Sequence, residues 1–203
     1  MLTNEAFHTT LEEVFRFHAK KAPGLAIGIS LVDQVRDRLG PVKERLNAIA
    51  ETPGCLVDVI MVMTGCTIGN NYLRIIPGLG RFALTMFDRF DGRGVRGAVD
   101  LARIDPRRTP ELAAFYHRTR SAEVQIGGPA REASRVKIME EFDRIGRDIF
   151  RFENVWVIDH GKPPVASAGI CASCGESFLI EESGVSRCAI CQGRYAYYRK
   201  TPS

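Results

Sequence analysis

The sequence predicts an α+β protein in which helices pack on an antiparallel sheet, followed by a small cysteine-rich module. Three observations support this fold class. Apolar residues recur with helical spacing at the start of the chain and again after its middle. Between these segments lie short β-branched runs that are separated by glycine-rich turns, as in β-hairpins. The last part of the chain holds two C-x-x-C pairs, which are typical of a module built around its cysteines.

Helices are predicted for the first part of the chain. Apolar side chains recur every three or four positions over residues 3–21, which is the period of an amphipathic helix. A second helix is expected over residues 24–39, because apolar residues recur there with helical spacing, and the Gly40-Pro41 pair should end it. Its AIGIS run is small and apolar, so another backbone can pack closely against it. Since proline suits the first turn of a helix, we expect a short third helix over residues 41–51.

The next part is predicted as four strands. Residues 56–63 (LVDVIMVM) are nearly continuously apolar and rich in β-branched side chains, as expected for a central strand covered on both faces. The runs YLRII, RFALTMFDRF and VRGAVDL follow at residues 72–76, 81–90 and 95–101. Because the PGLG and DGRG turns that join them are short, an antiparallel meander is the simplest arrangement.

Two helices and a strand are expected to complete the core. Thr109-Pro110-Glu111 begins a helix that reaches about residue 120, because proline and an acidic side chain are both favoured in a first turn. Apolar residues then recur on one face over residues 130–148, which predicts a longer helix. The alternation in FRFENVWVID, residues 150–159, predicts a last strand.

Domain boundaries and location follow from composition. The GKPP run at residues 161–164 is the best candidate for a linker, so we expect a core domain of residues 1–164 and a second domain of residues 165–203.

With 45% hydrophobic and 26% charged residues, the chain resembles ordinary globular proteins. The net charge of +4 permits an acidic partner but does not require one. No apolar run approaches the roughly 20 residues that span a bilayer, and no signal peptide is visible, so we expect a cytoplasmic protein without a membrane partner.

The cysteine-rich segment carries the strongest signal in the chain. Cys171 and Cys174 form one C-x-x-C pair and Cys188 and Cys191 another, with thirteen residues between the pairs. Each pair can place two thiolates around one ion, and four thiolates make the closed tetrahedral shell that zinc prefers in structural sites. The alternative is two disulfides, which are rare in a reducing cytoplasm. We therefore predict a structural Zn²⁺ held by the four cysteines, with no coordination position for a substrate.

Two arrangements are open for this segment. Its FLI run is a short apolar strand and Glu182-Ser183-Gly184 is a turn, so a hairpin joins the two cysteine pairs. The run QGRYAYYRK after Cys191 can form a short terminal helix, which would make a treble clef. Without that helix the segment would be a zinc ribbon.

Four sequence features occur together in a fixed order along the chain. They are FHAKKAPGLAIG at residues 17–28, TGCTIGN at 64–70, GLGRFALTMFDR at 78–89 and the four-cysteine tail. In this order they resemble the FmdE family, which is named for the E subunit of formylmethanofuran dehydrogenase. That enzyme is the molybdenum or tungsten complex that reduces carbon dioxide onto methanofuran in methanogenesis. The resemblance implies an α+β core with a treble-clef zinc finger, and a homodimer, for which the AIGIS run also offers a close-packing face.

The resemblance also implies a site in the core. The first motif of the family reads F-H-G-H-x-C-P-G, and here His18 keeps the first histidine while Lys20 and Ala22 replace the second histidine and the cysteine. The second motif keeps Cys66. If His18 and Cys66 meet in space, they could hold a second, weakly bound metal or act in catalysis as a thiolate and its base, with Lys20 supplying the charge of a missing metal. The alternatives are a buried Cys66 without chemistry and a His18 that is hydrogen-bonded in the core. Because the first motif is broken, the question whether the core is catalytic stays open.

Two functions from different classes remain. The leading hypothesis is a cytoplasmic metal-binding protein of the FmdE type, whose core pocket takes a metal or a small-molecule ligand and which can join a larger oxidoreductase complex. The alternative is a non-catalytic accessory or regulatory module that binds protein or nucleic acid through its zinc finger. Residues 194–200 interleave tyrosines with cations, as nucleic-acid clamps do, but zinc fingers are as often protein-binding or structural, so we do not expect nucleic acid. Cys55 has no partner within motif distance and is predicted to be structural.

Overall fold

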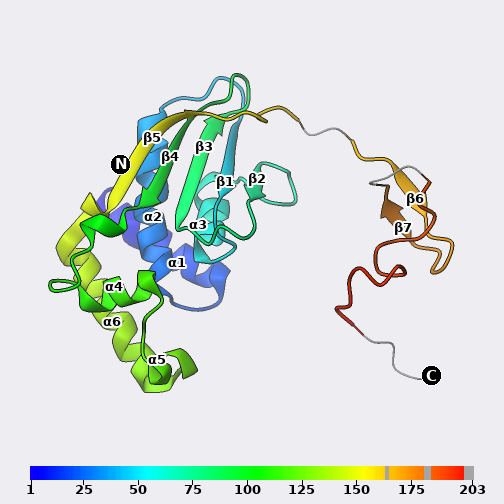
Figure 1. The fold of residues 1–203 in the computed structure, drawn as a ribbon. Coiled ribbons are helices and arrows are strands. Elements are labelled where there is room, and N and C mark those ends of the chain that lie inside the picture. The colour runs from blue at the N-terminus through cyan, green and yellow to red at the C-terminus, as the bar shows by residue number, and fades with distance from the viewer. Residues whose placement is uncertain (163–164, 181–183, 199–203) are drawn as a thin grey trace. The chain divides into compact units, whose positions relative to one another are not determined.

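The structure is a computed structural model, which describes residues 1–162, 165–180 and 184–198. The chain divides into two compact units, Met1–Gly161 and Lys162–Ser203 (Figure 1). We call the first unit the core and the second the tail. Pro163 and Pro164 of the predicted linker lie outside the described residues.

A five-stranded sheet organises the core (Figure 1). Its strands follow the order β2-β1-β3-β4-β5. β1 pairs with β2 in parallel, whereas the other neighbouring strands pair in antiparallel fashion. This mixed, mostly antiparallel sheet with packed helices confirms the predicted α+β class. The strands are β1 (Leu46–Ala50), β2 (Leu73–Ile75), β3 (Ala83–Asp88), β4 (Arg93–Val99) and β5 (Phe150–Trp156).

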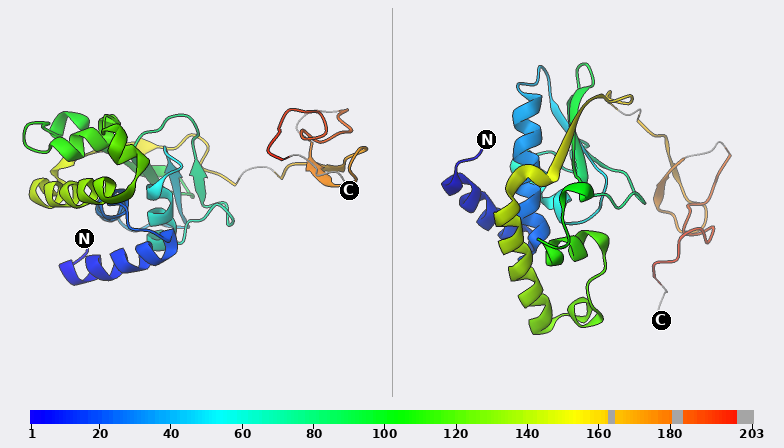
Figure 2. Two further views of the ribbon diagram at one scale, coloured as in Figure 1. Left: turned by 90° about the horizontal axis from the view of Figure 1, so that it is seen from below. Right: turned by 60° about the vertical axis from the view of Figure 1, so that its left-hand side comes forward.

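Some helices pack on this sheet and others pack against one another. α2 packs against β3 and β4, while α4 and α5 pack against α6 (Figures 1 and 2). No helix in the described part of the chain combines the length and the apolar character that a membrane crossing needs. The helices are α1 (Asn4–His18), α2 (Pro23–Leu39), α3 (Cys55–Thr64), α4 (Pro110–His117), α5 (Ala122–Ile126) and α6 (Gly128–Ile145), with 3-10 turns η1 (Leu101–Arg103) and η2 (Gly146–Ile149).

The longer helices lie where the sequence predicts them. α1, α2, α4 and α6 confirm the helices predicted near residues 3–21, 24–39, 109–120 and 130–148. α5 was not predicted, because its five residues are too few to show a helical period.

Helix α2 is buried on more than one side. Its residues 23–35 are all buried, because one side meets the sheet and another meets α3. A Cβ atom at Gly24 would lie 3.3 Å from Cβ of Cys55, and one at Gly28 would lie 3.0 Å from Cγ2 of Val59. The AIGIS run therefore packs closely against α3 of the same chain. The homodimer prediction keeps only the family resemblance as its basis.

Helix α3 replaces the central strand predicted over residues 56–63, and that prediction is wrong. The helix ends at Gly65, whose φ of 71° is in the left-handed region that favours glycine. A short, continuous apolar run fits a buried helix as well as a buried strand. Here the packing against α1 and α2 decides for the helix, since Leu56 and Ile60, one turn apart, are both fully buried.

Strand β1 replaces the third helix predicted over residues 41–51, which is also wrong. β1 lies between β2 and β3, and its hydrogen bonds to both neighbours outweigh the helix propensity of its leucine and alanine residues. The strand predicted at residues 72–76 is β2, but it pairs with β1. The predicted meander therefore holds only for β3 and β4, to which β5 adds.

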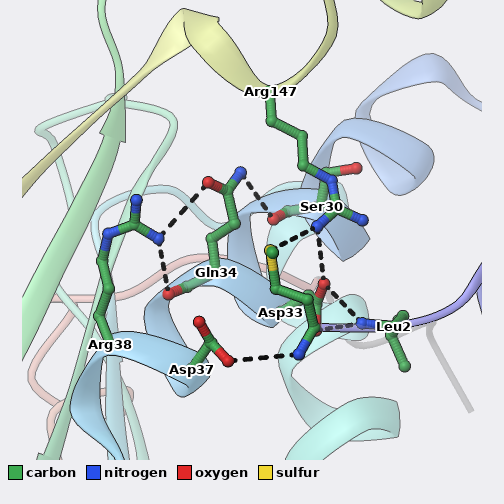
Figure 3. A network of polar contacts seen from close by, with 8 residues as sticks. Leu2, Ser30, Asp33, Gln34, Asp37, Arg38 and Arg147 are labelled. Carbon is green, nitrogen blue, oxygen red and sulfur yellow. Dashed lines mark hydrogen bonds and ion pairs between the residues drawn. The ribbon is translucent and has the colours of Figure 1, made fainter.

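A polar network fixes the N-terminal segment to α2 and η2 (Figure 3). The Asp33 carboxylate on α2 accepts hydrogen bonds from the backbone N–H of Leu2 at 3.0 Å and from the Arg147 guanidinium at 3.1 Å. The α-amino group of Met1 forms an ion pair with Asp37 at 3.2 Å. Three separate segments thus meet at one buried carboxylate, which sets the position of α1 relative to α2.

The tail consists of a two-stranded antiparallel sheet and the two cysteine turns. β6 (Ala168–Ile170) precedes the first cysteine pair, and β7 (Ser177–Leu179) follows it and matches the predicted FLI strand. Residues 192–198 form turns, bends and irregular backbone, so the short terminal helix of the treble-clef alternative does not occur within these residues. The described residues do not include 181–183 and 199–203, which hold Glu182 and Ser183 of the predicted turn, together with Arg199 and Lys200.

Candidate functional site

The four cysteines of the tail converge on one point. Their Sγ atoms all lie within 4.8 Å of one another, and those of Cys174 and Cys188 are 3.9 Å apart. The backbone N–H of Cys188 donates to Sγ of Cys171 at 3.3 Å, and that of Cys191 donates to Sγ of Cys188 at 3.5 Å. These hydrogen bonds orient the sulfurs and stabilise negative charge on them.

The spacing of the sulfurs fits a single metal ion. Zinc–sulfur bonds are about 2.3 Å long, so the sulfurs of a regular tetrahedron around zinc are about 3.8 Å apart. The distance between Cys174 and Cys188 is close to this value. Sulfur ligands also select zinc and other soft or borderline ions over magnesium and calcium. The structure therefore brings the four predicted ligands together in a shape suited to a metal.

Electrostatics within this cluster favours a cation. Backbone N–H groups of Cys188 and Cys174 lower the pKa of the Cys171 thiol to about 6. By contrast, hydrogen bonding with the side chains of Cys188 and Cys174 raises the pKa of Cys191 to about 12. The four sulfurs therefore cannot all be thiolates at neutral pH unless a positive charge lies between them, and a divalent ion would supply that charge.

In the core, His18 contacts Asp58 and Cys55 rather than Cys66. His18 ends α1, and Cys55 and Asp58 lie in the first turn of α3. Nδ1 of His18 lies 2.6 Å from Oδ2 of Asp58, and Nε2 lies 3.7 Å from Sγ of Cys55. The side chains of His18 and Asp58 are 18% and 29% exposed, so this group lies at the edge of the core.

Cys66 is buried and has a different partner. It follows the glycine that ends α3, and its thiol donates a hydrogen bond to the carbonyl oxygen of Leu46 at 3.3 Å. Only 1% of Cys66 is exposed, and burial raises the pKa of its thiol. Because both ring nitrogens of His18 contact other groups, the structure does not pair Cys66 with His18. These surroundings favour the alternative of a buried Cys66 without chemistry.

The contacts from Asp58 to His18 and from His18 to Cys55 resemble those of a base that a carboxylate orients toward a thiol. The carboxylate holds the imidazole through Nδ1, which leaves Nε2 facing the sulfur. Burial raises the pKa of Cys55 and the charge of Asp58 adds to this effect, whereas the ammonium of Lys20 lowers it. Cys55 is therefore a neutral thiol at rest, and Lys20 acts on Cys55 instead of on Cys66.

The prediction that Cys55 has no partner within motif distance does not anticipate these contacts. The sequence contains a signal for the contact between Cys55 and Asp58, because residues three positions apart lie on the same face of a helix. In a strand, residues three apart point to opposite faces. The wrong strand prediction for residues 56–63 therefore concealed the pair.

A cavity of about 710 Å³ lies elsewhere in the core. A Cβ atom at Gly97 of β4 would meet Leu31 and Val35 of α2, so the neighbouring Arg96, which lines the cavity, points to the opposite face of the sheet. The aromatic rings of Phe82, Phe115 and Tyr116 form part of its wall. The arginines that line it are Arg81, Arg96, Arg118, Arg120 and Arg151.

The chain is similar to a known protein family and to a solved structure. A family model described as "FmdE, Molybdenum formylmethanofuran dehydrogenase operon" matches residues 17–154, which include His18, Cys55 and Cys66. A similar crystal structure is that of a protein from Syntrophus aciditrophicus that is described as like FmdE, the E subunit of tungsten formylmethanofuran dehydrogenase. Its TM-score is 0.75 and its sequence identity 27%. That similarity covers 95% of each chain.

A curated relative adds a second comparison. It is a probable S-adenosyl-L-methionine-binding protein from Archaeoglobus fulgidus, 30% identical over 191 residues. The alignment covers 88% of this chain and 51% of the relative, so the chain spans about half the length of that protein.

Proposed function

Since this chain belongs to the FmdE family, we propose that it is a zinc-binding accessory protein whose tail holds one structural Zn²⁺. The observation that carries this proposal is the convergence of the four tail sulfurs within 4.8 Å of one another. A closed shell of four thiolates leaves no position for a substrate, so the ion maintains the fold of the tail and takes no part in a reaction.

An accessory role is supported by how the relatives are described. The family description names an operon of formylmethanofuran dehydrogenase, and the Syntrophus aciditrophicus protein is described as similar to one component of that enzyme. Neither description names a reaction catalysed by that component. A small zinc module can give an accessory protein a rigid surface. A segment of this size could not fold without its metal.

The zinc content of the full chain tests the proposal. The protein would be purified without added metal or a histidine tag, and its metal measured by mass spectrometry. We expect about one zinc ion per chain, and less than roughly a tenth of that in the Cys174→Ser, Cys188→Ser double variant, because two thiolates alone bind zinc weakly.

A Ser177→Ala variant is the matched control for this measurement, because Ser177 is an exposed residue of β7. It should keep its zinc. A chain that holds no zinc would contradict the proposal. Zinc that persists in the double variant but is lost in Cys55→Ser would place the ion in the core instead.

The name of the archaeal relative raises S-adenosyl-L-methionine as a ligand. This molecule carries a sulfonium and an ammonium group against one carboxylate, so its net charge is positive. Five arginines line the core cavity, and like charges repel each other. We therefore do not assign S-adenosyl-L-methionine to this cavity.

A further inference from the structure

Five arginine side chains meet at one cavity although they come from separate parts of the chain. Arg81 precedes β3, Arg118 and Arg120 follow α4, and Arg96 and Arg151 lie in β4 and β5. The register of β4 and β5 places Arg96 and Arg151 on the same face of the sheet, the face away from α2. The fold therefore gathers these cations, which the sequence distributes over 71 positions.

Two of the five arginines are balanced by carboxylates. Glu51 pairs with Arg96 at 2.6 Å and with Arg81 at 3.6 Å, and Glu153 pairs with Arg96 at 3.3 Å. The hydrogen bond from Arg96 lowers the pKa of Glu51 against the opposing effect of burial, so Glu51 stays charged at neutral pH. These pairs fix the Arg96 guanidinium at the cavity wall, where the Arg96 side chain is 15% exposed.

The other three arginines have no such partner in the part of the chain that the structure describes. Within residues 1–162, 165–180 and 184–198, no ion pair involves Arg118, Arg120 or Arg151. The acidic residue in the lining, Asp100, pairs with an arginine outside the cavity at 3.3 Å. Arg118 donates to the carbonyl oxygen of Gly80 at 3.5 Å, a long hydrogen bond that leaves its charge unbalanced. Five cations against Glu51, Glu153 and Asp100 leave an excess of positive charge, which an anion would neutralise.

The wall between these arginines is aromatic. The Tyr116 ring makes edge contacts with Phe115 and Phe82, at 5.1 Å and 5.6 Å between ring centroids. Arg120 lies over the Phe115 ring at 5.1 Å. Aromatic surface beside arginine offers a place for a flat apolar group next to a charged one.

We propose that this arginine cavity binds a small anionic molecule that carries two or more negative charges on phosphate or carboxylate groups and has a flat apolar part. The planar guanidinium groups of Arg118, Arg120 and Arg151 match phosphate and carboxylate oxygens, which they can bind through two hydrogen bonds each. The flat part would contact Phe82 and Phe115. The volume of about 710 Å³ lies within the range of small-molecule sites. This site is separate from the tail cysteines, so the proposal does not depend on zinc.

The proposal is tested by measuring the affinity of two ring-containing anions and comparing each with a neutral analogue. ADP and adenosine probe a phosphate site, and phthalate and phthalamide probe a carboxylate site, with the full chain in a calorimeter at low salt. We expect ADP or phthalate to bind at least about tenfold more tightly than its neutral counterpart, because hydrogen bonds to charged groups contribute most of the affinity. The anion that binds identifies the chemistry of the ligand.

Variants of the lining arginines complete the test. Arg118→Gln and Arg151→Gln change exposed side chains, and each should weaken anion binding about tenfold without changing the circular dichroism spectrum. Arg108→Gln, which is exposed but outside the cavity, should bind as tightly as the natural sequence. The proposal is overturned if neither anion binds, if the neutral compounds bind equally well, or if the lining variants bind as tightly as Arg108→Gln.

Discussion

Removal of zinc by a chelator is expected to unfold the tail and to leave the core folded. Among the described residues of the tail, only Cys171 is buried, and the two strands have three residues each. Such a segment has almost no apolar core to replace the metal. Structural zinc sites contribute about 10 to 16 kcal/mol of apparent binding free energy in small domains, so the loss of the ion removes most of the stability of the tail.

Nuclear magnetic resonance of the full chain measures this effect. Amide signals of residues 165–180 and 184–198 should move to the narrow range of an unfolded chain when zinc is removed, while those of the core stay in place. One equivalent of added zinc should restore them. A tail that keeps its dispersed signals without metal would show that another interaction holds it.

The Gly97→Ala substitution is expected to destabilise the core by about 1 to 3 kcal/mol. Gly97 lies in β4 beneath α2, where an added Cβ would be 2.5 Å from Cγ2 of Val35 and 2.9 Å from Cδ1 of Leu31. Real side-chain carbons do not approach so closely, so α2 would have to move away from the sheet. The free energy of unfolding falls because α2 also packs against α3 and therefore cannot shift freely.

Urea denaturation, followed by circular dichroism, compares Gly97→Ala with the natural sequence. Gly161→Ala is the matched control, since an added Cβ there meets no atom within 4 Å and its φ does not require glycine. The control should unfold at the same urea concentration as the natural sequence. An unchanged midpoint in Gly97→Ala would mean that α2 does not pack on β4 as described.

The helices α1, α2, α4 and α6 and the strands β3 and β4 could be predicted from the sequence, whereas α3 and β1 could not. α1 has enough turns for its apolar side chains to show the period of 3.6 residues. α3 and β1 are short and largely apolar, so their class depends on what covers them. Sheet pairing made β1 a strand and helix packing made α3 a helix, and neither partner is visible in the local pattern.

The two candidate sites differ in the same way. The tail cysteines could be predicted because the C-x-x-C spacing itself encodes the turn that brings two sulfurs together. The contact between His18 and Cys55 joins residues 37 positions apart, at the end of one helix and the start of another. Only the packing of α1 on α3 brings them together, whereas the resemblance to the family's motifs pointed to Cys66.

The central claim is that four tail sulfurs hold one zinc ion, and X-ray absorption at the zinc edge tests it most directly. The full chain, as purified, should show four sulfur neighbours at about 2.3 Å and no nitrogen or oxygen neighbour at about 2.0 Å. A nearest shell that contains nitrogen would place the ion at a histidine such as His18, and would contradict the assignment of zinc to Cys171, Cys174, Cys188 and Cys191.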